Sequence, residues 1–445
     1  MEKTRGRFLL IFVVVVVVVL LTAMQFTNDG GQNRHFSDEE VAAKLLDVKK
    51  VISDDRLCQM HYHISTSLFK KLHNKCIGAV QESYKLPLYY QVAIYLDYIS
   101  HGTSIREQFI QFKVSFPLII LARRNIRHAI MCKVYPQFVR PQMVDEEVEG
   151  IENTTRTPRG LKEGDLDTKS WEKFKHFEGC MGNIDGSHIK ICSDAETNTT
   201  FFSSRKKAVT TNVQFVATVN KSLMFTHAFV GIEGRASDSQ SMRLAAFARD
   251  LEETFGPWTR GRFLIGDAGY ALSFKMLTPY RGVMYHLREF SVRQANNENQ
   301  HYVKNMYELF NLRHAMFRNE VERAFGVLKK RYKILVNGIQ GYDLNETWNT
   351  IYSCIAIHNF IRYHLFEGNG SQATADARIL LEVDADADAD AETALADARL
   401  ALLDGEQDAP NMDVNVNQAL AGTPSAWRDQ IAYKMWTDYT GNLAE

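Results

Sequence analysis

The sequence is poor in cysteine and has almost no net charge. None of its six cysteines forms a Cys-x-x-Cys pair or takes a zinc-finger spacing, so we expect reduced, packed thiols in an intracellular protein and no disulfide framework. The hydrophobic fraction of 45% is ordinary for a globular protein and excludes disorder along the whole chain. A length of 445 residues leaves room for two or three domains with a substantial core.

The formal net charge of −1 conceals a strong segregation of charge along the chain. Residues 171–366 carry 25 basic and 18 acidic residues, a net charge of +7, whereas residues 367–445 carry 4 and 16, a net charge of −12. A basic body with an acidic tail favours a nucleic-acid partner. Mild basicity is common among proteins, so the charge alone does not establish a nucleic-acid partner, and the sequence motifs are needed as further evidence.

Residues 8–24 are an uncharged apolar run, preceded by three basic residues. Its 17 residues are just long enough to span a thin bilayer with the N-terminus on the cytoplasmic side. A signal peptide is an alternative, although no clear cleavage site follows. Seven consecutive valines also suit a wrongly assigned start codon or a low-complexity accident. The sequence does not choose among these interpretations.

The region 37–135 has the pattern of helices. Ser37 and Glu40 have the spacing of a capping box, which predicts the start of a helix. Pro87 and Gly102 stand at the two ends of a further helical run, because a first turn tolerates proline and a C-terminal cap favours glycine.

A short helix over 104–111, a tight turn and a helix over 116–130 resemble a helix-turn-helix. The second helix carries Arg123, Arg124 and Arg127, which would contact DNA phosphates in a DNA-reading motif. The alternative is an ordinary helical bundle with a solvated basic face. The spacing alone leaves both open.

Beyond residue 180 the pattern changes to short β-type runs and long helices. Strands are predicted over 181–191, 212–219, 223–232 and 262–267, and helices over 238–255, 303–332 and 346–364. This order predicts an α/β fold with a mixed sheet, preceded by the all-α, helix-turn-helix-like domain.

Changes in composition divide the chain into six parts: a hydrophobic N-terminal segment and linker over 1–36, a helical domain over 37–135, a linker over 136–179, an α/β domain over 180–366, an acidic low-complexity tail over 367–426 and a C-terminal amphipathic helix over 427–445. The tail is expected to be disordered, because the ten acidic residues between 382 and 408 are accompanied by a single arginine. The final helix is expected either to dock back on the α/β domain or to bind a partner.

Three carboxylates of the α/β domain stand where metal-dependent cleavage of phosphodiester bonds needs them. Such cleavage uses two Mg²⁺ or Mn²⁺ ions, which prefer oxygen ligands. Asp185 lies in an apolar strand, where an unpaired charge is costly, and Asp267 ends another apolar strand. Glu322 shares a helix face with His314 and Arg318. Taken singly, each acid also suits an ordinary structural role, as a turn residue, a strand end or one half of a helical ion pair.

Taken together, these segments resemble the PIF/Harbinger transposases and the nucleases derived from them. Motifs of that family follow one another in order over about 180 residues: GNIDGSHI (182–189), Ser-Arg-Lys within 203–207, NVQFVATV (212–219), GRASDSQ (234–240), LIGDAGY (264–270), LTPYRG (277–282), FNLRHAMFRNEVERAFGVLKKRYKIL (310–335) and IAIHNFI (355–361). The resemblance implies an RNase H-like nuclease fold over 180–366 with a DDE triad. In that triad Asp185, Asp267 and Glu322 are the first, second and third acids and the metal ligands.

The resemblance leaves several neighbouring residues with two interpretations. Asp238 caps the helix that follows it, which we favour, or lies near the metals. Arg318, Arg323 and Lys329 flank the third acid on its helix and suit phosphate contacts or a solvated surface equally well. A weaker resemblance covers the helical region 55–130, but its apolar segment over 114–121 departs from the family pattern.

The family implies a DNA endonuclease or transposase that uses Mg²⁺ or Mn²⁺, acts in the nucleus and works with a separate Myb/SANT-like DNA-binding protein. The main alternative is a domesticated protein that has lost catalysis and binds DNA or chromatin. The presence of all three acids argues against that alternative. A homo-oligomer stays open, and so does a membrane location if residues 8–24 are an anchor.

Overall fold

The computed structural model describes residues 36–80, 82–83, 86–146, 155–192, 199–204, 206–220, 222–256, 258, 261–284, 303–341, 343–365 and 422–441. The apolar run 8–24 and nearly all of the acidic tail over 367–426 lie outside these residues. Within the described ranges, no helix is both long enough and apolar enough to cross a membrane.

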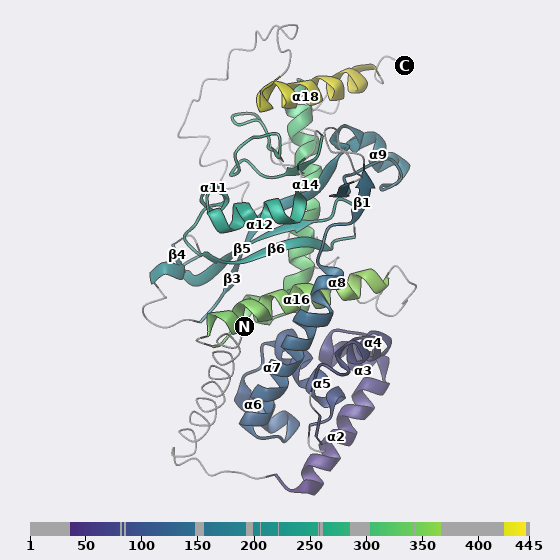
Figure 1. Ribbon diagram of the computed structural model, residues 1–445, viewed down its shortest axis with the longest axis vertical. Coiled ribbons are helices and arrows are strands. Elements are labelled where there is room, and N and C mark those ends of the chain that lie inside the picture. The colour runs from purple at the N-terminus through teal and green to yellow at the C-terminus, as the bar shows by residue number, and fades with distance from the viewer. Residues whose placement is uncertain are drawn as a thin grey trace, which may run out of the picture.

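The N-terminal region is a bundle of helices, drawn in purple and blue in Figure 1: α2 (Asp38–Ser53), α3 (Asp55–Tyr62), α4 (Thr66–Cys76), α5 (Leu88–His101), α6 (Ile105–Phe112), α7 (Phe116–Lys133) and α8 (Tyr135–Phe138). The predicted capping box of α2 is confirmed, because Ser37 and Glu40 exchange hydrogen bonds of 2.9 and 3.1 Å. Gly102 ends α5 with φ 72°, a left-handed conformation that favours glycine. The predicted order of short helix, turn and helix is also present, in α6 and α7.

The predicted linker over 136–179 contains regular structure. β1 (Met143–Glu146) and β2 (Thr155–Pro158) pair antiparallel, and α9 (Thr168–Phe174) and the 3₁₀ helix η1 (Lys175–Phe177) follow. The two strands satisfy each other's backbone hydrogen-bonding groups. The polar composition of this segment did not indicate that it would form strands. Leu161 is buried, and its amide donates to the carbonyl of Cys180 at 2.7 Å, which attaches the segment to the central sheet.

A mixed sheet of six strands forms the centre of the molecule: β3 (Cys180–Lys190), β4 (Phe202–Ser203), β5 (Ala208–Ala217), β6 (Phe225–Glu233), β7 (Phe263–Ile265) and β8 (Met276–Leu277). β3 lies in the middle, antiparallel to β5 and parallel to β7. β6 and β4 pair antiparallel with the other edge of β5, and β8 pairs parallel with β7. The four predicted strands and the mixed sheet are therefore confirmed.

Helices cover both faces of this sheet (Figure 1). They are α11 (Asp238–Met242), α12 (Ala245–Phe255), α14 (Met306–Arg331), α15 (Ile334–Asn337) and α16 (Leu344–Leu365). On one face, Phe247 and Leu251 of α12 pack against Ile184 and Val216. On the other, α14 and α16 share a core with β5 and β6. The single helix predicted over 238–255 is wrong, because the chain breaks between α11 and α12.

The N-terminal helices and the sheet share one hydrophobic core. α7 packs against α16, and α5 packs against α15. Two polar contacts accompany this packing: Tyr95 of α5 is hydrogen bonded to Ser353 of α16, and the amide of Lys333 donates to the carbonyl of Ser100 at 3.1 Å. The helical region therefore supports the side of the sheet that carries α14.

The C-terminal helix α18 (Pro424–Gly441) docks back on the α/β region, one of the two expected outcomes. Ala432 and Met435 are fully buried against α14, and Trp427 lies 5.1 Å from the ring of Phe263 on β7. The hydroxyl of Tyr280 donates to Asp429 at 2.6 Å. The last helix thus completes the core around the first half of α14.

A half-buried histidine, His63, and a fully buried one, His314, connect α14 to its neighbours. His63 Nδ1 donates to the carbonyl of Arg331 at 2.5 Å, and His314 Nε2 donates to the carbonyl of Leu277 at 3.2 Å. Burial lowers the pKa of His63 to about 4 and that of His314 to about 3. The unfolded chain titrates near pH 6.5, so below that pH it binds protons that the folded protein does not. Stability therefore falls as the pH falls from about 6.5 towards 4.

We expect the free energy of unfolding to decrease by about 2 kcal/mol per histidine between pH 7.5 and pH 5. Urea titrations at the two pH values measure it. His314→Gln keeps a donor for the carbonyl of Leu277 and should lose its share of the decrease. An equal decrease in the variant and the parent protein would contradict a buried neutral imidazole at this position.

Candidate active site

Asp185 lies on β3, and Asp267 follows the end of the neighbouring strand β7. The parallel pairing of these strands ends with Asn183 opposite Ile265, and each aspartate comes two residues after its member of this pair. The predicted first and second acids therefore both follow the same end of one strand pairing, and their joint role at a metal stays a prediction.

The turn after β7 is held tightly against the sheet. Asp267 Oδ1 accepts a hydrogen bond of 2.8 Å from the amide of Gly269. A Cβ on Gly266 would lie 2.8 Å from the ring of Tyr270, so only glycine fits there. Tyr270 is buried, and its hydroxyl donates to Gln214 of β5. The sequence alone did not indicate the contact between Tyr270 and Gln214, although Tyr270 stands in the LIGDAGY motif.

Glu322 reaches the site from α14. The side chain of Asn183, fully buried on β3, donates to the carbonyl of Phe317 at 3.0 Å and so sets the position of α14 along the strand. Arg318 Nη1 then lies 2.9 Å from Asp185 Oδ2, and its Nη2 contacts Glu322 Oε1. The exposed fractions of the three side chains are 13% for Arg318, 15% for Asp185 and 51% for Glu322. One guanidinium therefore joins the predicted first and third acids.

These acids suit a hard divalent cation in their chemistry, because all three supply carboxylate oxygens. Asp185 and Glu322 already converge on one positive group, which shows that the fold can present both to a cation. Among the residues that the structure describes, no three histidine, cysteine or acidic side chains gather closely enough to hold a metal ion. The observed contacts thus bring Asp185 and Glu322 together, and Asp267 follows the end of the neighbouring strand β7.

Lys329 is half-buried on the face of α14 that meets β3. Its Nζ donates to Ser187 Oγ at 2.7 Å and to the carbonyl of His188 at 3.2 Å. Burial lowers the pKa of Lys329 to about 8, helped by Lys206 and opposed by Asp185. This lysine therefore holds the part of β3 that follows Asp185, and a phosphate contact from it stays a prediction.

Asp238 is the first residue of α11, and the predicted cap is wrong. Ser237 is the N-cap residue: its hydroxyl accepts from the amide of Gln240 at 3.3 Å, and the side chain of Gln240 accepts from the amide of Ser237 at 2.9 Å. A serine and a glutamine three residues later form a complete capping box. The sequence contains this pattern one residue before the aspartate.

The basic residues predicted to contact DNA divide into exposed and internal groups. Arg323 pairs with Glu320 on its own helix, at 3.5 Å. On α7, Arg123 lies over a tyrosine ring at 3.8 Å, and Arg127 is 8% exposed and pairs with Glu346 of α16 at 2.7 Å. Arg123 and Arg127 thus have partners within the protein itself, and phosphate contacts from them stay a prediction. Arg124 is exposed.

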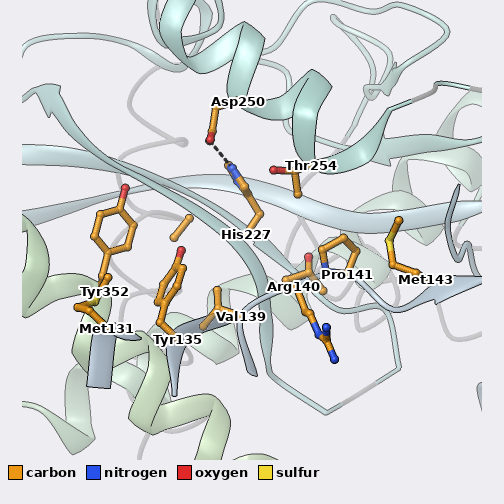
Figure 2. A pocket seen from close by; sticks show the side chains of 12 residues that line it. Met131, Tyr135, Val139, Arg140, Pro141, Met143, His227, Asp250, Thr254 and Tyr352 are labelled. Atoms are coloured by element: carbon orange, nitrogen blue, oxygen red, sulfur yellow. Dashed lines mark hydrogen bonds and ion pairs between the residues drawn. The ribbon is translucent and has the colours of Figure 1, made fainter. Parts of the chain in front are cut away.

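A separate pocket of about 460 Å³ opens at the β6 edge of the sheet (Figure 2). His227 of β6 points towards Asp250 of α12, and its Nε2 donates to that carboxylate at 2.5 Å. Tyr135 and Tyr352 line the other side, from α8 and α16. β5 separates β6 from β3, so this pocket is distinct from the acids, and none of the predicted site residues lines it.

Residues 184–359 match the family model described as DDE superfamily endonuclease. "Protein ALP1-like" of Arabidopsis thaliana is 25% identical over 205 residues, which cover 43% of this chain and 45% of that protein. The chain therefore matches less than half the length of this curated relative. No solved structure gives a significant match.

The matched segment begins in β3, ends in α16 and includes Asp185, Asp267 and Glu322. A DDE endonuclease domain implies an RNase H-like fold, which agrees with the mixed sheet around β3. The match also agrees with the order of motifs along the sequence. We conclude that this chain contains a DDE superfamily endonuclease domain, over residues 184–359.

Proposed function

We propose that this protein is a divalent-metal-dependent DNA endonuclease of the Harbinger transposase type. The observation that carries this proposal is that acids from distant segments contact one group: Asp185 and Glu322 both pair with the guanidinium of Arg318. Asp267 follows the end of β7, the strand that pairs with β3. The match to the DDE superfamily endonucleases supports the same conclusion.

In this proposal Asp185, Asp267 and Glu322 hold Mg²⁺ or Mn²⁺. When bound, such cations activate a water or hydroxyl nucleophile and stabilise the leaving oxygen of a phosphodiester bond. The chain itself sets the spacing of the ligands: β3, the turn after β7 and α14 each supply one carboxylate. Attack by water breaks the bond between phosphorus and the 3′ oxygen, and the 3′-hydroxyl that is released can attack a target strand in turn.

The charge of the domain fits a DNA substrate. Residues 171–366 carry a net charge of +7, which favours association with a polyanion at low salt. We propose that Arg318 and Arg323 on α14 and Arg124 on α7 supply phosphate contacts. By the Harbinger resemblance, we further propose a nuclear location and a Myb/SANT-like DNA-binding partner.

Removal of any one acid tests the triad. Asp185→Asn, Asp267→Asn and Glu322→Gln should each lower Mg²⁺-dependent nicking of supercoiled plasmid by at least about a hundredfold, because each removes a charged ligand without changing shape. Glu320→Gln, on the same helix as Glu322, is the matched control and should retain nicking. Thermal melting checks that all four variants fold.

Full nicking in one of the three variants removes that residue from the triad. If the unmodified protein binds DNA in a mobility-shift assay but never nicks it with Mg²⁺ or Mn²⁺, the proposed activity is wrong. The domesticated, non-catalytic alternative would then stand in its place.

Asp238→Asn separates Asp238 from Asp267. Because Ser237 supplies the cap of α11, we expect Asp238→Asn to change the melting temperature very little and to leave nicking intact. Asp267→Asn, measured in the same two assays, should be stable and inactive. An inactive but stable Asp238→Asn protein would bring Asp238 into the metal site.

The arginines of α7 test DNA contact by the helical region. Arg124→Ala should flatten the dependence of log binding constant on log salt by about 0.9 for one lost phosphate contact. Arg127→Ala should instead lower the urea midpoint, because it leaves Glu346 without its buried partner. An unchanged salt slope in Arg124→Ala would favour a helical bundle that does not read DNA.

A further inference from the structure

The guanidinium of Arg318 occupies the space between two of the proposed metal ligands. It pairs with Asp185 of β3 at 2.9 Å and with Glu322, one turn further along α14. Arginine carries its charge at every pH at which the protein folds, and its two terminal nitrogens can bind two carboxylates at once. Arg318 thus neutralises a pair of acids that would otherwise repel each other across the junction of strand and helix.

A divalent cation and this guanidinium compete for the same oxygens. Mg²⁺ and Mn²⁺ bind carboxylate oxygens at about 2 Å, whereas the guanidinium needs a nitrogen near 2.9 Å from each of them. Asp185 Oδ2 and Glu322 Oε1 are the atoms that Arg318 contacts. A cation held between the two acids therefore has to displace Arg318 from at least one of them.

Lys329, a second basic residue of α14 that contacts β3, is bound differently. It donates to a hydroxyl and a backbone carbonyl, Ser187 Oγ and His188 O, which are not ligands in the proposed triad. A metal at the acids leaves these contacts intact. Of these two side chains, Arg318 is therefore the one whose contacts a metal at the acids would break.

We propose that Arg318 is a placeholder for the metal. It holds Asp185 and Glu322 in position until the divalent cation binds, and then turns its guanidinium towards a phosphate of the DNA. This inference rests on the proposed function, because it assumes that the two acids are metal ligands. A planar fork that binds carboxylates also binds phosphate, so the same side chain suits both partners in turn.

Binding of Mn²⁺ alone to the full-length protein, measured by calorimetric titration without DNA, tests the exchange. Arg318→Gln should bind Mn²⁺ about tenfold more tightly than the unmodified protein, because the cation no longer competes with an internal charge. Its melting temperature should be lower in EDTA and should rise more on addition of Mn²⁺. Arg313→Gln, on the same helix but in contact with His176 of η1, should bind Mn²⁺ like the unmodified protein.

The Asp185→Asn variant tests the proposed metal site itself, independently of the role of Arg318. Loss of Mn²⁺ binding in Asp185→Asn supports the metal site. If Arg318→Gln then binds Mn²⁺ equally or more weakly than the unmodified protein, Arg318 positions the ligands and the placeholder inference is wrong. If Asp185→Asn binds Mn²⁺ with the same affinity as the unmodified protein, the proposed metal site is wrong. It is also wrong if both the variant and the unmodified protein fail to bind Mn²⁺.

Arg318→Lys keeps the experiment decisive if Arg318→Gln does not fold. Lysine retains the charge but has a single nitrogen, so it cannot bridge both carboxylates with the geometry of the fork. It should bind Mn²⁺ with an affinity between those of the unmodified protein and Arg318→Gln, and more tightly than the unmodified protein in any case. Weaker binding by Arg318→Lys would overturn the exchange.

Discussion

The position of α14 along β3 decides whether Asp185 and Glu322 meet, because β3 carries the first of these acids and α14 carries the other. The buried side chain of Asn183 bonds to the backbone of α14, and His63 and His314 attach that helix to α3 and β8. Buried hydrogen bonds of this kind cost more when unmade than they contribute when made. A slip of one residue along α14 would rotate Glu322 by about 100° away from the strand. The candidate site therefore depends on the seating of this helix.

The electrostatics of the site follow from that seating. Acids that lie close together in a partly buried position need positive charge nearby. α14 supplies two cations, Arg318 and Lys329, and both contact β3. Arg318 touches the acids themselves, whereas Lys329 holds the backbone beside them. The same helix thus carries a proposed ligand, its counter-charge and a support for the strand.

The N-terminal helices contribute to the site through packing. They share one core with α14, α16 and the sheet, and Arg127 uses its charge to hold α16. Some basic side chains of α7 contact other helices of the protein, so fewer of them are exposed for contact with DNA. The contribution that the structure shows for this region is therefore support of the sheet from below in Figure 1.

Much of the fold could be predicted from local signals. Alternation and apolar runs indicated β3, β5, β6 and β7 within a few residues, and capping residues marked the start of α2 and the end of α5. Those signals work because backbone conformation is decided mostly by neighbours along the chain. The break between α11 and α12 was missed, because the apolar pattern continues across it.

The sequence by itself indicated four strands of the central sheet and most of the long helices, and its ordered motifs singled out Asp185, Asp267 and Glu322. Only the tertiary structure decided where each charge lies. Lys329 and Arg124 are both basic residues on predicted helices, yet one is half-buried against β3 and the other is exposed. Helical spacing says which side chains share a face, but whether another element covers that face depends on contacts between segments far apart in the chain.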